Sequence, residues 1–218
     1  MRAGGAVPNL GLRSSDVYQE GLTVQTNPMK IVGRWREGFV FDYHVVSSIY
    51  VGDDEFGHPR FDTRRSELGE LLYRLKYQAD KSVVDELART VGAFVQQWSK
   101  ALNAIVPVPP TLANRACQPV VLVAKALGEY LGLPCIERAV WKTKDTPQLK
   151  DVSDYNERLG LLAGAFSVDM SEVGGRKVLL LDDLYRSGAT LNAVASALYD
   201  QGGAAEVYAI AMTRTRRG

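Results

Sequence analysis

Two adjacent carboxylates, Asp182 and Asp183, directly follow the apolar residues 178–181. The apolar run predicts a buried strand, so the carboxylates are expected where that strand emerges. In an open α/β sheet, ligands bind beyond the carboxyl ends of the strands. An ionised carboxylate only accepts hydrogen bonds, which suits sugar hydroxyls because they donate them. The pair therefore predicts a site for sugar hydroxyls.

The residues after the carboxylates form a short polar segment that leads into a helical pattern. A helix N-terminus offers free backbone N–H groups and a partial positive charge, which favour phosphate. Gly188 would let the backbone approach an anion closely. Ser187 and Thr190 could add hydroxyl donors, and Arg186 a positive charge. The combination predicts a ribose 5-phosphate ligand, and the alternative is an acidic strand end that binds nothing.

Two common nucleotide-binding motifs are absent from the sequence. It contains neither Gly-x-x-x-x-Gly-Lys-Ser/Thr nor Gly-x-Gly-x-x-Gly. Those glycine-rich loops cradle phosphates in nucleotide hydrolases and in dinucleotide-dependent oxidoreductases. Their absence argues against both classes.

The elements that position this segment alternate from residue 104 onward. Apolar strands are expected near 104–110, 134–141, 176–183 and 205–214, with helices near 120–134, 153–166 and 190–203. This alternation predicts an α/β fold with a twisted, mostly parallel sheet and helices on both faces. Two amphipathic helices precede it, with Ser66 and Asp80 as candidate N-caps.

The N-terminal part has a different pattern. Residues 1–30 predict an irregular arm, and residues 31–62 predict a small β appendage. Within it, Phe39, Phe41, Tyr43 and Val45 alternate with polar positions, which predicts a half-buried strand. The sequence therefore predicts an N-terminal arm and appendage over 1–65 and an α/β domain over 66–218.

Composition restricts the class of protein. Lys and Arg number 26 against 25 Asp and Glu, and this balance argues against a protein that coats nucleic acid. No signal-like run and no stretch of about 20 apolar residues occurs, so a cytoplasmic protein without a membrane span is expected. Cys117 and Cys135 exclude a zinc ribbon and are expected as apolar core residues. His44 and His58 alone do not make a metal site.

The segment VLLLDDLYRSGAT, residues 178–190, resembles the signature of type I phosphoribosyltransferases. The resemblance extends to the ComF-type branch, named for competence-associated proteins, through LLYRLKYQAD, IVPVPP, NRACQPVVLVAKAL, TPQLKDVSDYNERLGLLAGAF and AMTRT. These pieces cover about residues 66–215 in the family's order. The resemblance implies the type I phosphoribosyltransferase fold, with 5-phosphoribosyl 1-diphosphate (PRPP) as ligand and Mg²⁺ as cofactor.

The resemblance also implies roles for single residues. Asp182 and Asp183 would hold the ribose hydroxyls and act in catalysis, with Asp182 touching Mg²⁺ through water. The 5-phosphate would lie on Arg186, Ser187, Gly188, Ala189 and Thr190. The diphosphate would lie near Pro107, Val108, Pro109, Arg115 and Gln118. The alternatives are a proline-terminated strand at 107–109 and ordinary helix residues at 115 and 118.

Residues 138–148 correspond to the mobile segment that closes over the active site in these enzymes. Arg138 and Lys142 would act in catalysis, and Lys144 and Gln148 would bind the ligand. Cationic side chains suit this role because departing diphosphate builds negative charge. The alternative is a solvated charged loop. Tyr155, Asn156 and Arg158 match a family motif loosely, and a helix facing the sheet explains them equally well.

Two departures from the family pattern stand out. The chain lacks the usual N-terminal zinc ribbon, so no zinc is expected, and Arg186 stands where the family has small residues. Three functions remain open: transfer of phosphoribosyl to a nitrogen nucleophile, non-catalytic sensing of PRPP or a nucleotide, and an accessory role in DNA uptake or repair. The near-zero net charge weakens the third. A homodimer is compatible with each.

Overall fold

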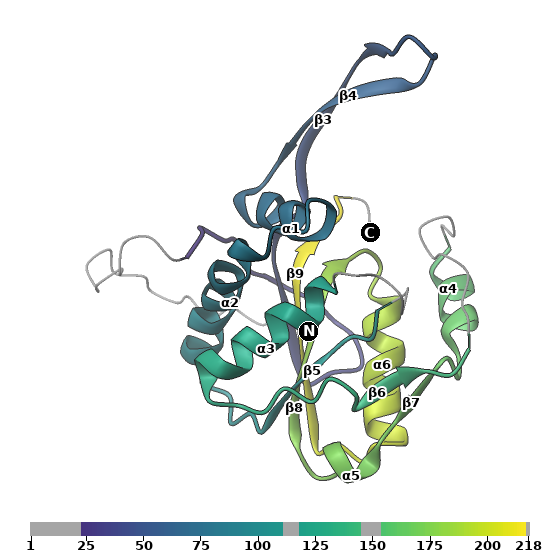
Figure 1. Cartoon of the computed structure of the whole chain (residues 1–218). Coiled ribbons are helices and arrows are strands. Elements are labelled where there is room, and N and C mark those ends of the chain that lie inside the picture. The colour runs from purple at the N-terminus through teal and green to yellow at the C-terminus, as the bar shows by residue number, and fades with distance from the viewer. Residues whose placement is uncertain (1–22, 111–117, 145–153, 217–218) are drawn as a thin grey trace, which may run out of the picture.

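The computed structural model describes residues 23–110, 118–144 and 154–216. Within them a central sheet has the strand order β1-β2-β9-β8-β5 (Figure 1). Its strands are β1 (Met29–Lys30), β2 (Glu37–Tyr43), β9 (Glu206–Arg214), β8 (Lys177–Tyr185) and β5 (Ala104–Pro107). All neighbours pair in parallel except β1, which is antiparallel to β2. The predicted mostly parallel α/β sheet is confirmed.

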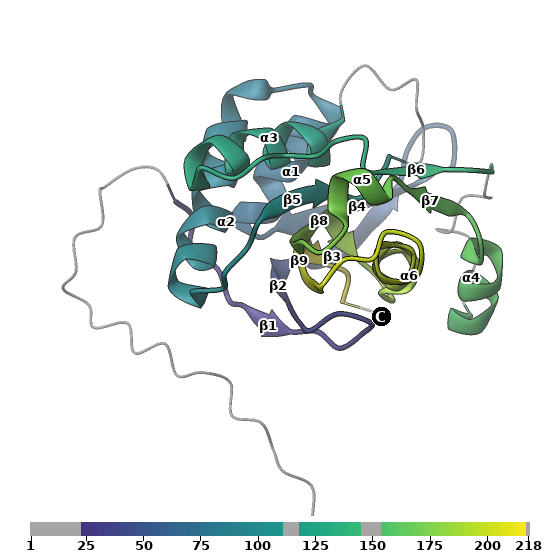
Figure 2. The same ribbon diagram turned by 90° about the horizontal axis from the view of Figure 1, so that it is seen from below.

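Helices cover both faces of this sheet. Figure 2 shows α1 (Glu67–Tyr77), α2 (Val84–Trp98) and α3 (Pro119–Leu131) on one face, and α6 (Ala189–Asp200) on the other. Strand alternation divides β8 accordingly, since Leu179 and Leu181 pack under α1–α3 whereas Val178 and Leu180 pack under α6. All four side chains are fully buried. This strand therefore carries two hydrophobic cores.

The helix boundaries follow their capping residues. Ser66 Oγ accepts the Gly69 N–H at 3.0 Å and begins α1. Asp80 caps the short 3₁₀ turn η1 (Lys81–Val83) before α2. Gly132, with φ of +66°, ends α3 because glycine adopts the left-handed conformation without a steric cost. Ser66 and Asp80 were predicted as N-caps.

Smaller elements complete the fold. Two short strands, β6 (Val140–Lys142) and β7 (Phe166–Val168), pair antiparallel beside α6. The helix α4 (Tyr155–Leu162) precedes β7, and the short helix α5 (Met170–Val173) precedes β8. A strand predicted over residues 134–141 is present only as β6 and as a bridge between Cys135 and Ile105. No helix among the described residues is long and apolar enough to cross a bilayer.

A two-stranded hairpin, β3 (Val45–Asp53) and β4 (Pro59–Arg65), projects from the body of the molecule (Figure 1). The predicted appendage is thus shorter than residues 31–62, because β2 pairs in parallel with β9 inside the main sheet. The predicted half-buried alternation in this strand is also wrong: Phe39, Val40 and Phe41 are all buried. A division between residues 65 and 66 therefore cuts through the sheet.

Candidate functional site

The two carboxylates lie at the carboxyl edge of the sheet but inside the strand. β8 stays paired with β9 as far as Tyr185, whereas β5 ends opposite Leu181. Asp182 and Asp183 therefore lie just beyond the end of β5. Because side chains alternate along a strand, the two carboxylates belong to opposite faces. Asp182 lines a small pocket with the start of α6, and Asp183 lines a larger pocket with α1.

Burial sets Asp182 apart from a solvent-exposed carboxylate. Asp182 is 9% exposed, and burial, followed by the Asp183 charge, raises its pKa to about 8. Its Oδ1 accepts the Asp183 N–H at 2.8 Å. A carboxyl group with this pKa is protonated at neutral pH and can donate a hydrogen bond as well as accept one. Two ionised carboxylates that only accept hydrogen bonds were expected from the sequence, whereas burial favours the protonated form of Asp182.

An ion pair holds the Asp183 side chain. Lys76 Nζ, from the last turn of α1, lies 2.7 Å from Asp183 Oδ2, and both side chains are largely buried. The Thr213 hydroxyl donates to the Asp183 carbonyl oxygen at 3.0 Å. Sequence reasoning missed Lys76 because nothing in the sequence indicates that α1 ends above the carboxyl edge of β8.

The predicted phosphate loop lies where β8 turns into α6. Gly188 has a φ of +79° and precedes the first residue of α6, and among the described side chains none caps this helix start. The loop and Asp182 line a pocket of about 60 Å³. Arg158 also lines it and donates from Nη1 to Ser187 Oγ at 2.9 Å. The pocket thus combines helix N–H groups, two hydroxyls and guanidinium groups beside a carboxyl.

The Tyr185 ring packs against this loop. A Cβ atom at position 188 would lie 2.8 Å from the Tyr185 hydroxyl. Glycine is therefore required at 188 both by the left-handed backbone and by the close ring. Arg186, which departs from the family pattern, lines both the small and the larger pocket.

The segment after β5 reaches the same edge. Pro107 pairs with Leu181, and the Val108 N–H donates to the Leu181 carbonyl at 2.8 Å. Pro107 and Val108 therefore lie next to the part of β8 that carries Asp182, and the diphosphate role of residues 107–109 stays a prediction. Gln118 occupies the N-cap position of α3. Arg115 and Gln148 lie outside the described residues.

Arg138, Lys142 and Lys144 belong to a different part of the molecule. They lie on or next to β6, which pairs with β7, and Gln201, just past the end of α6, donates to the Phe166 carbonyl of β7. Lys144 Nζ donates to the Ala163 carbonyl at 2.8 Å. β6 lies beside α6 (Figure 1), and neither Arg138 nor Lys142 lines the pockets next to Asp182 and Asp183.

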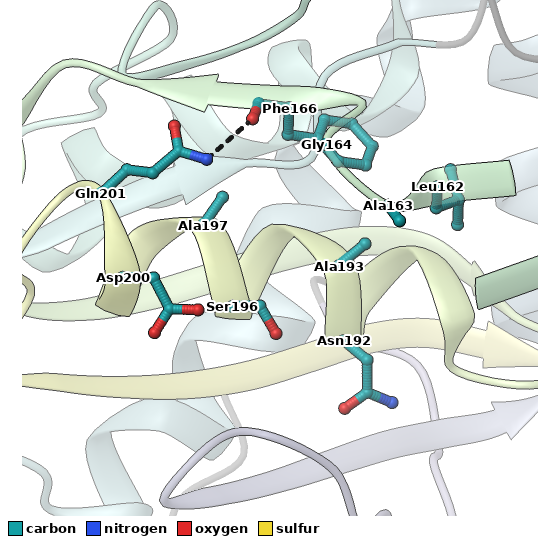
Figure 3. Close-up of a pocket in the computed structure, with 10 residues that line it drawn as sticks. All are labelled: Leu162, Ala163, Gly164, Phe166, Asn192, Ala193, Ser196, Ala197, Asp200 and Gln201. Atoms are coloured by element: carbon teal, nitrogen blue, oxygen red, sulfur yellow. Dashed lines mark hydrogen bonds between the residues drawn. The ribbon is translucent and has the colours of Figure 1, made fainter. Parts of the chain in front are cut away.

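A separate pocket of about 260 Å³ lies between α6 and the chain from α4 to β7. Figure 3 shows the Gln201 amide bonded to the Phe166 carbonyl at one end of it, with Asn192, Ser196 and Asp200 along α6. Asp200 forms an ion pair with Arg34. This pocket shares no lining residue with the pockets next to Asp182 and Asp183.

A pocket of about 490 Å³ opens on the other side of Asp183. Three parts of the chain form its walls: the base of the hairpin, the last turns of α1, and the ends of β8 and β9. The hairpin base contributes His44, Val45 and Ser48, and α1 contributes Leu72, Lys76 and Tyr77.

Metal-binding chemistry is limited at this edge. Across residues 23–110, 118–144 and 154–216, no group of three or more His, Cys, Asp or Glu side chains is placed to hold a metal ion. The residues present still fit Mg²⁺ brought by a ligand, because this ion keeps several water ligands and is coordinated mainly by the phosphate oxygens of the ligand. A cation near Asp182 would also offset the burial that raises the pKa of its carboxyl.

Two known competence proteins are similar to this chain in sequence. No family model matches the chain. The chain is 28% identical to competence protein F of Haemophilus influenzae over 140 residues, and this match spans 60% of the chain and 61% of that protein. It is 25% identical over 159 residues to competence protein ComFC of Streptococcus pneumoniae, covering 72% and 68%. The predicted resemblance to ComF-type proteins is confirmed, and the chain spans under two thirds of the Haemophilus relative.

Solved structures with a similar chain path include adenine phosphoribosyltransferases. The Trypanosoma brucei enzyme, in complex with AMP, pyrophosphate and ribose 5-phosphate, has a TM-score of 0.46 at 10% identity and covers 88% of this chain and 87% of its own. The Leishmania tarentolae enzyme has a TM-score of 0.45 at 10% identity and covers 86% and 94%.

Proposed function

We propose that this protein binds PRPP and transfers its phosphoribosyl group to a nitrogen nucleophile with release of diphosphate. The observation that carries the proposal is the arrangement around β8. Asp182 and Asp183 lie between the end of β5 and the uncapped start of α6. That arrangement offers carboxyl groups for ribose hydroxyls next to N–H groups for a phosphate.

In this proposal the sugar lies across the end of β8. The 5-phosphate accepts hydrogen bonds from the backbone N–H groups of residues 188–190 and from the Ser187 and Thr190 hydroxyls. The ribose hydroxyls meet Asp182 and Asp183, and the diphosphate lies toward Pro107–Pro109. Mg²⁺, when bound to the diphosphate, would supply charge neutralisation and would contact Asp182 through water.

The chain's own residues would favour transfer in two ways. The Asp182 and Asp183 carboxyl groups, on opposite faces of β8, would hold different ribose hydroxyls,. Together they would fix the orientation of C1 toward the incoming nitrogen, and orientation of the reacting atoms is itself a large part of catalysis. Arg186, which lines both pockets, would place positive charge near the departing diphosphate.

Asp183→Asn tests the binding step. Replacing a charged hydrogen-bond partner costs about 1.5–3 kcal/mol, so calorimetry should show PRPP affinity, with Mg²⁺ present, reduced about 10- to 150-fold. Asp62→Asn on the exposed hairpin is the matched control, since Asp62 lies outside the site, and it should leave the affinity unchanged. An Asp183→Asn variant that binds PRPP as tightly as the control would contradict the placement.

A sensing role is the second candidate, and a specific observation favours it. Arg138 and Lys142, the cationic residues expected to act in catalysis, line neither of the pockets next to Asp182 and Asp183. Diphosphate release measured across a panel of bases and amines separates the two functions. Tight PRPP binding without turnover on any acceptor would favour a protein that reports PRPP or nucleotide levels.

An accessory role in DNA uptake is supported only by the names of the two competence-protein relatives. The net charge of +1 argues against broad nucleic-acid binding,. We propose a cytoplasmic location, which fits a free Cys135 that is half-buried against the α1–α3 core. In that position the thiol packs as a small apolar group.

A further inference from the structure

The small pocket at the phosphate loop has one wall that comes from outside the loop. Its lining residues lie within residues 182–191, except for Arg158, which belongs to α4. Arg158 stands 29 residues before Ser187 in the sequence. Figure 2 shows α4 beside α6, and the two helices are in contact. This packing brings a guanidinium group from a separate element to the start of α6.

Arg158 is bonded to the loop through Ser187. Its Nη1 donates to Ser187 Oγ at 2.9 Å. A hydroxyl group that accepts through its oxygen still has its own hydrogen to donate, so Ser187 can hold Arg158 and donate to a ligand oxygen at the same time.

The guanidinium can likewise serve more than one partner. It carries five N–H donors in a planar fork, and Arg158 has further interactions within the described part of the chain. A ligand would therefore share this side chain with the groups that already position it.

The size of the pocket favours a compact group. Its volume is about 60 Å³, whereas sites for whole small molecules measure roughly 300–1,000 Å³. An aromatic ring or a complete sugar would not fit inside it. A phosphate group at the end of a larger ligand would, with the rest of that ligand lying toward Asp182.

The chemistry of the pocket favours a phosphate over a neutral group. A phosphate monoester carries about −1.5 to −2 charges at pH 7. The start of α6 offers N–H groups with only a partial positive charge, and Arg158 adds a full one. Guanidinium groups bind phosphate through paired, charge-assisted hydrogen bonds.

We propose that Arg158 makes this site selective for a sugar that carries a 5-phosphate, because its guanidinium binds the phosphate directly and also holds Ser187 in place. This inference rests on the proposed function and extends it, since residues 187–190 alone held the phosphate there. Arg158 acts in ligand binding, at the opposite end of the sugar from the bond that breaks at C1.

Two probes separate the phosphate pocket from the rest of the site. Calorimetry on the full chain with Mg²⁺ measures ribose 5-phosphate and, separately, inorganic diphosphate. We expect Arg158→Gln to weaken ribose 5-phosphate at least tenfold, because a charge-assisted hydrogen bond is lost. The affinity for diphosphate should stay within twofold, since that group lies toward Pro107–Pro109 in the proposed function.

Two further variants serve as comparisons. Arg158→Lys keeps the charge and loses the planar fork, so it should recover part of the affinity for ribose 5-phosphate. Arg176→Gln is the matched control, because Arg176 immediately precedes β8 and lies at the opposite end of that strand from the loop. It should leave the affinity for both probes unchanged.

A second measurement distinguishes direct contact with the phosphate from an effect through Ser187. Ser187→Ala removes the bond between the two side chains. If Arg158 contacts the phosphate, adding Arg158→Gln to Ser187→Ala should weaken ribose 5-phosphate at least tenfold further. If Arg158 acts only by holding Ser187, the second substitution would change nothing, and the direct contact is refuted.

Separate outcomes overturn the two proposals. If the native chain binds ribose 5-phosphate and Arg158→Gln binds it as tightly as Arg176→Gln does, the role of Arg158 is refuted and the proposed function stands. Equal losses for ribose 5-phosphate and diphosphate in Arg158→Gln also refute selectivity for the 5-phosphate. If the native chain binds neither ribose 5-phosphate nor PRPP, the proposed function fails, and the role of Arg158 fails with it.

Discussion

The ion pair between Lys76 and Asp183 predicts a measurable loss of stability when Lys76 is replaced by methionine. Methionine keeps most of the apolar stem and removes the charge. The Nζ to Oδ2 distance is 2.7 Å, and the side chains are 24% and 19% exposed. The pair is thus neither fully buried nor on the surface.

The magnitude follows from these distances and exposures. At an effective dielectric constant of about 20, two unit charges at about 4 Å attract by about 4 kcal/mol, before the cost of removing them from water. Exposed pairs contribute about 0–1 kcal/mol, and breaking a fully buried pair costs about 3–5 kcal/mol. The Lys76→Met variant should therefore lose about 2 kcal/mol, because the burial of this pair lies between those limits.

Urea or guanidinium unfolding of the full chain measures this loss. Lys177→Met, at the other end of β8, is the matched control, since Lys177 pairs with Glu206 at 3.7 Å and is 41% exposed. A double-mutant cycle with Asp183→Asn should give a coupling energy of about 1–2 kcal/mol. If Lys76→Met costs no more than Lys177→Met and the coupling is near zero, the reasoning about this pair is wrong.

Two further predictions concern the same edge of the sheet. Gly188→Ala should lose about 1–3 kcal/mol of stability, because φ at this position is +79° and the new Cβ would lie 2.8 Å from the Tyr185 hydroxyl. Gly203→Ala is the control and should lose less, since φ there is +61° and a Cβ would meet open space. Equal losses in thermal unfolding would exclude the steric contact. Asp182→Asn should change the pH dependence of stability. The carboxyl pKa is raised from 3.8 to about 8 in the folded protein, so the native chain loses stability as pH rises between those two values. The variant should therefore gain stability relative to the native chain between about pH 4 and about pH 8, and a constant difference would refute the raised pKa,.

Local signals predicted the strand, turn and helix that carry the candidate site because these elements are neighbours in sequence. The apolar run, the two carboxylates and Gly188 lie within one strand, turn and helix, so their arrangement follows from secondary structure alone. The caps at Ser66 and Gly132 were predictable for the same reason. Burial was harder, since nothing in two adjacent aspartates shows that Asp182 is enclosed and Asp183 is paired.

Contacts between segments that are distant in the sequence could not be predicted from local pattern. Phe39 and Phe41 alternate with polar neighbours, which predicted a half-buried strand, but the alternation did not show that β9 would pair beside it and that Val40 would be covered too. The catalytic roles of Arg138 and Lys142 follow from resemblance alone and stay predictions, since neither residue lines the two pockets at the sheet edge. Tertiary pairing decides the burial of β2, and local sequence pattern does not contain it.

The N-terminal segment completes the site although it was expected to stand apart from it. β2 runs parallel to β9, so its carboxyl end reaches the same edge as Asp183, and the chain leaves the sheet there through His44. After the hairpin it returns through Ser66, whose hydroxyl donates to the Tyr43 carbonyl at 2.6 Å. This bond fixes the start of α1 beside the end of β2, and α1 then carries Lys76 to Asp183. A ligand bound at Asp183 would consequently contact residues from both halves of the sequence.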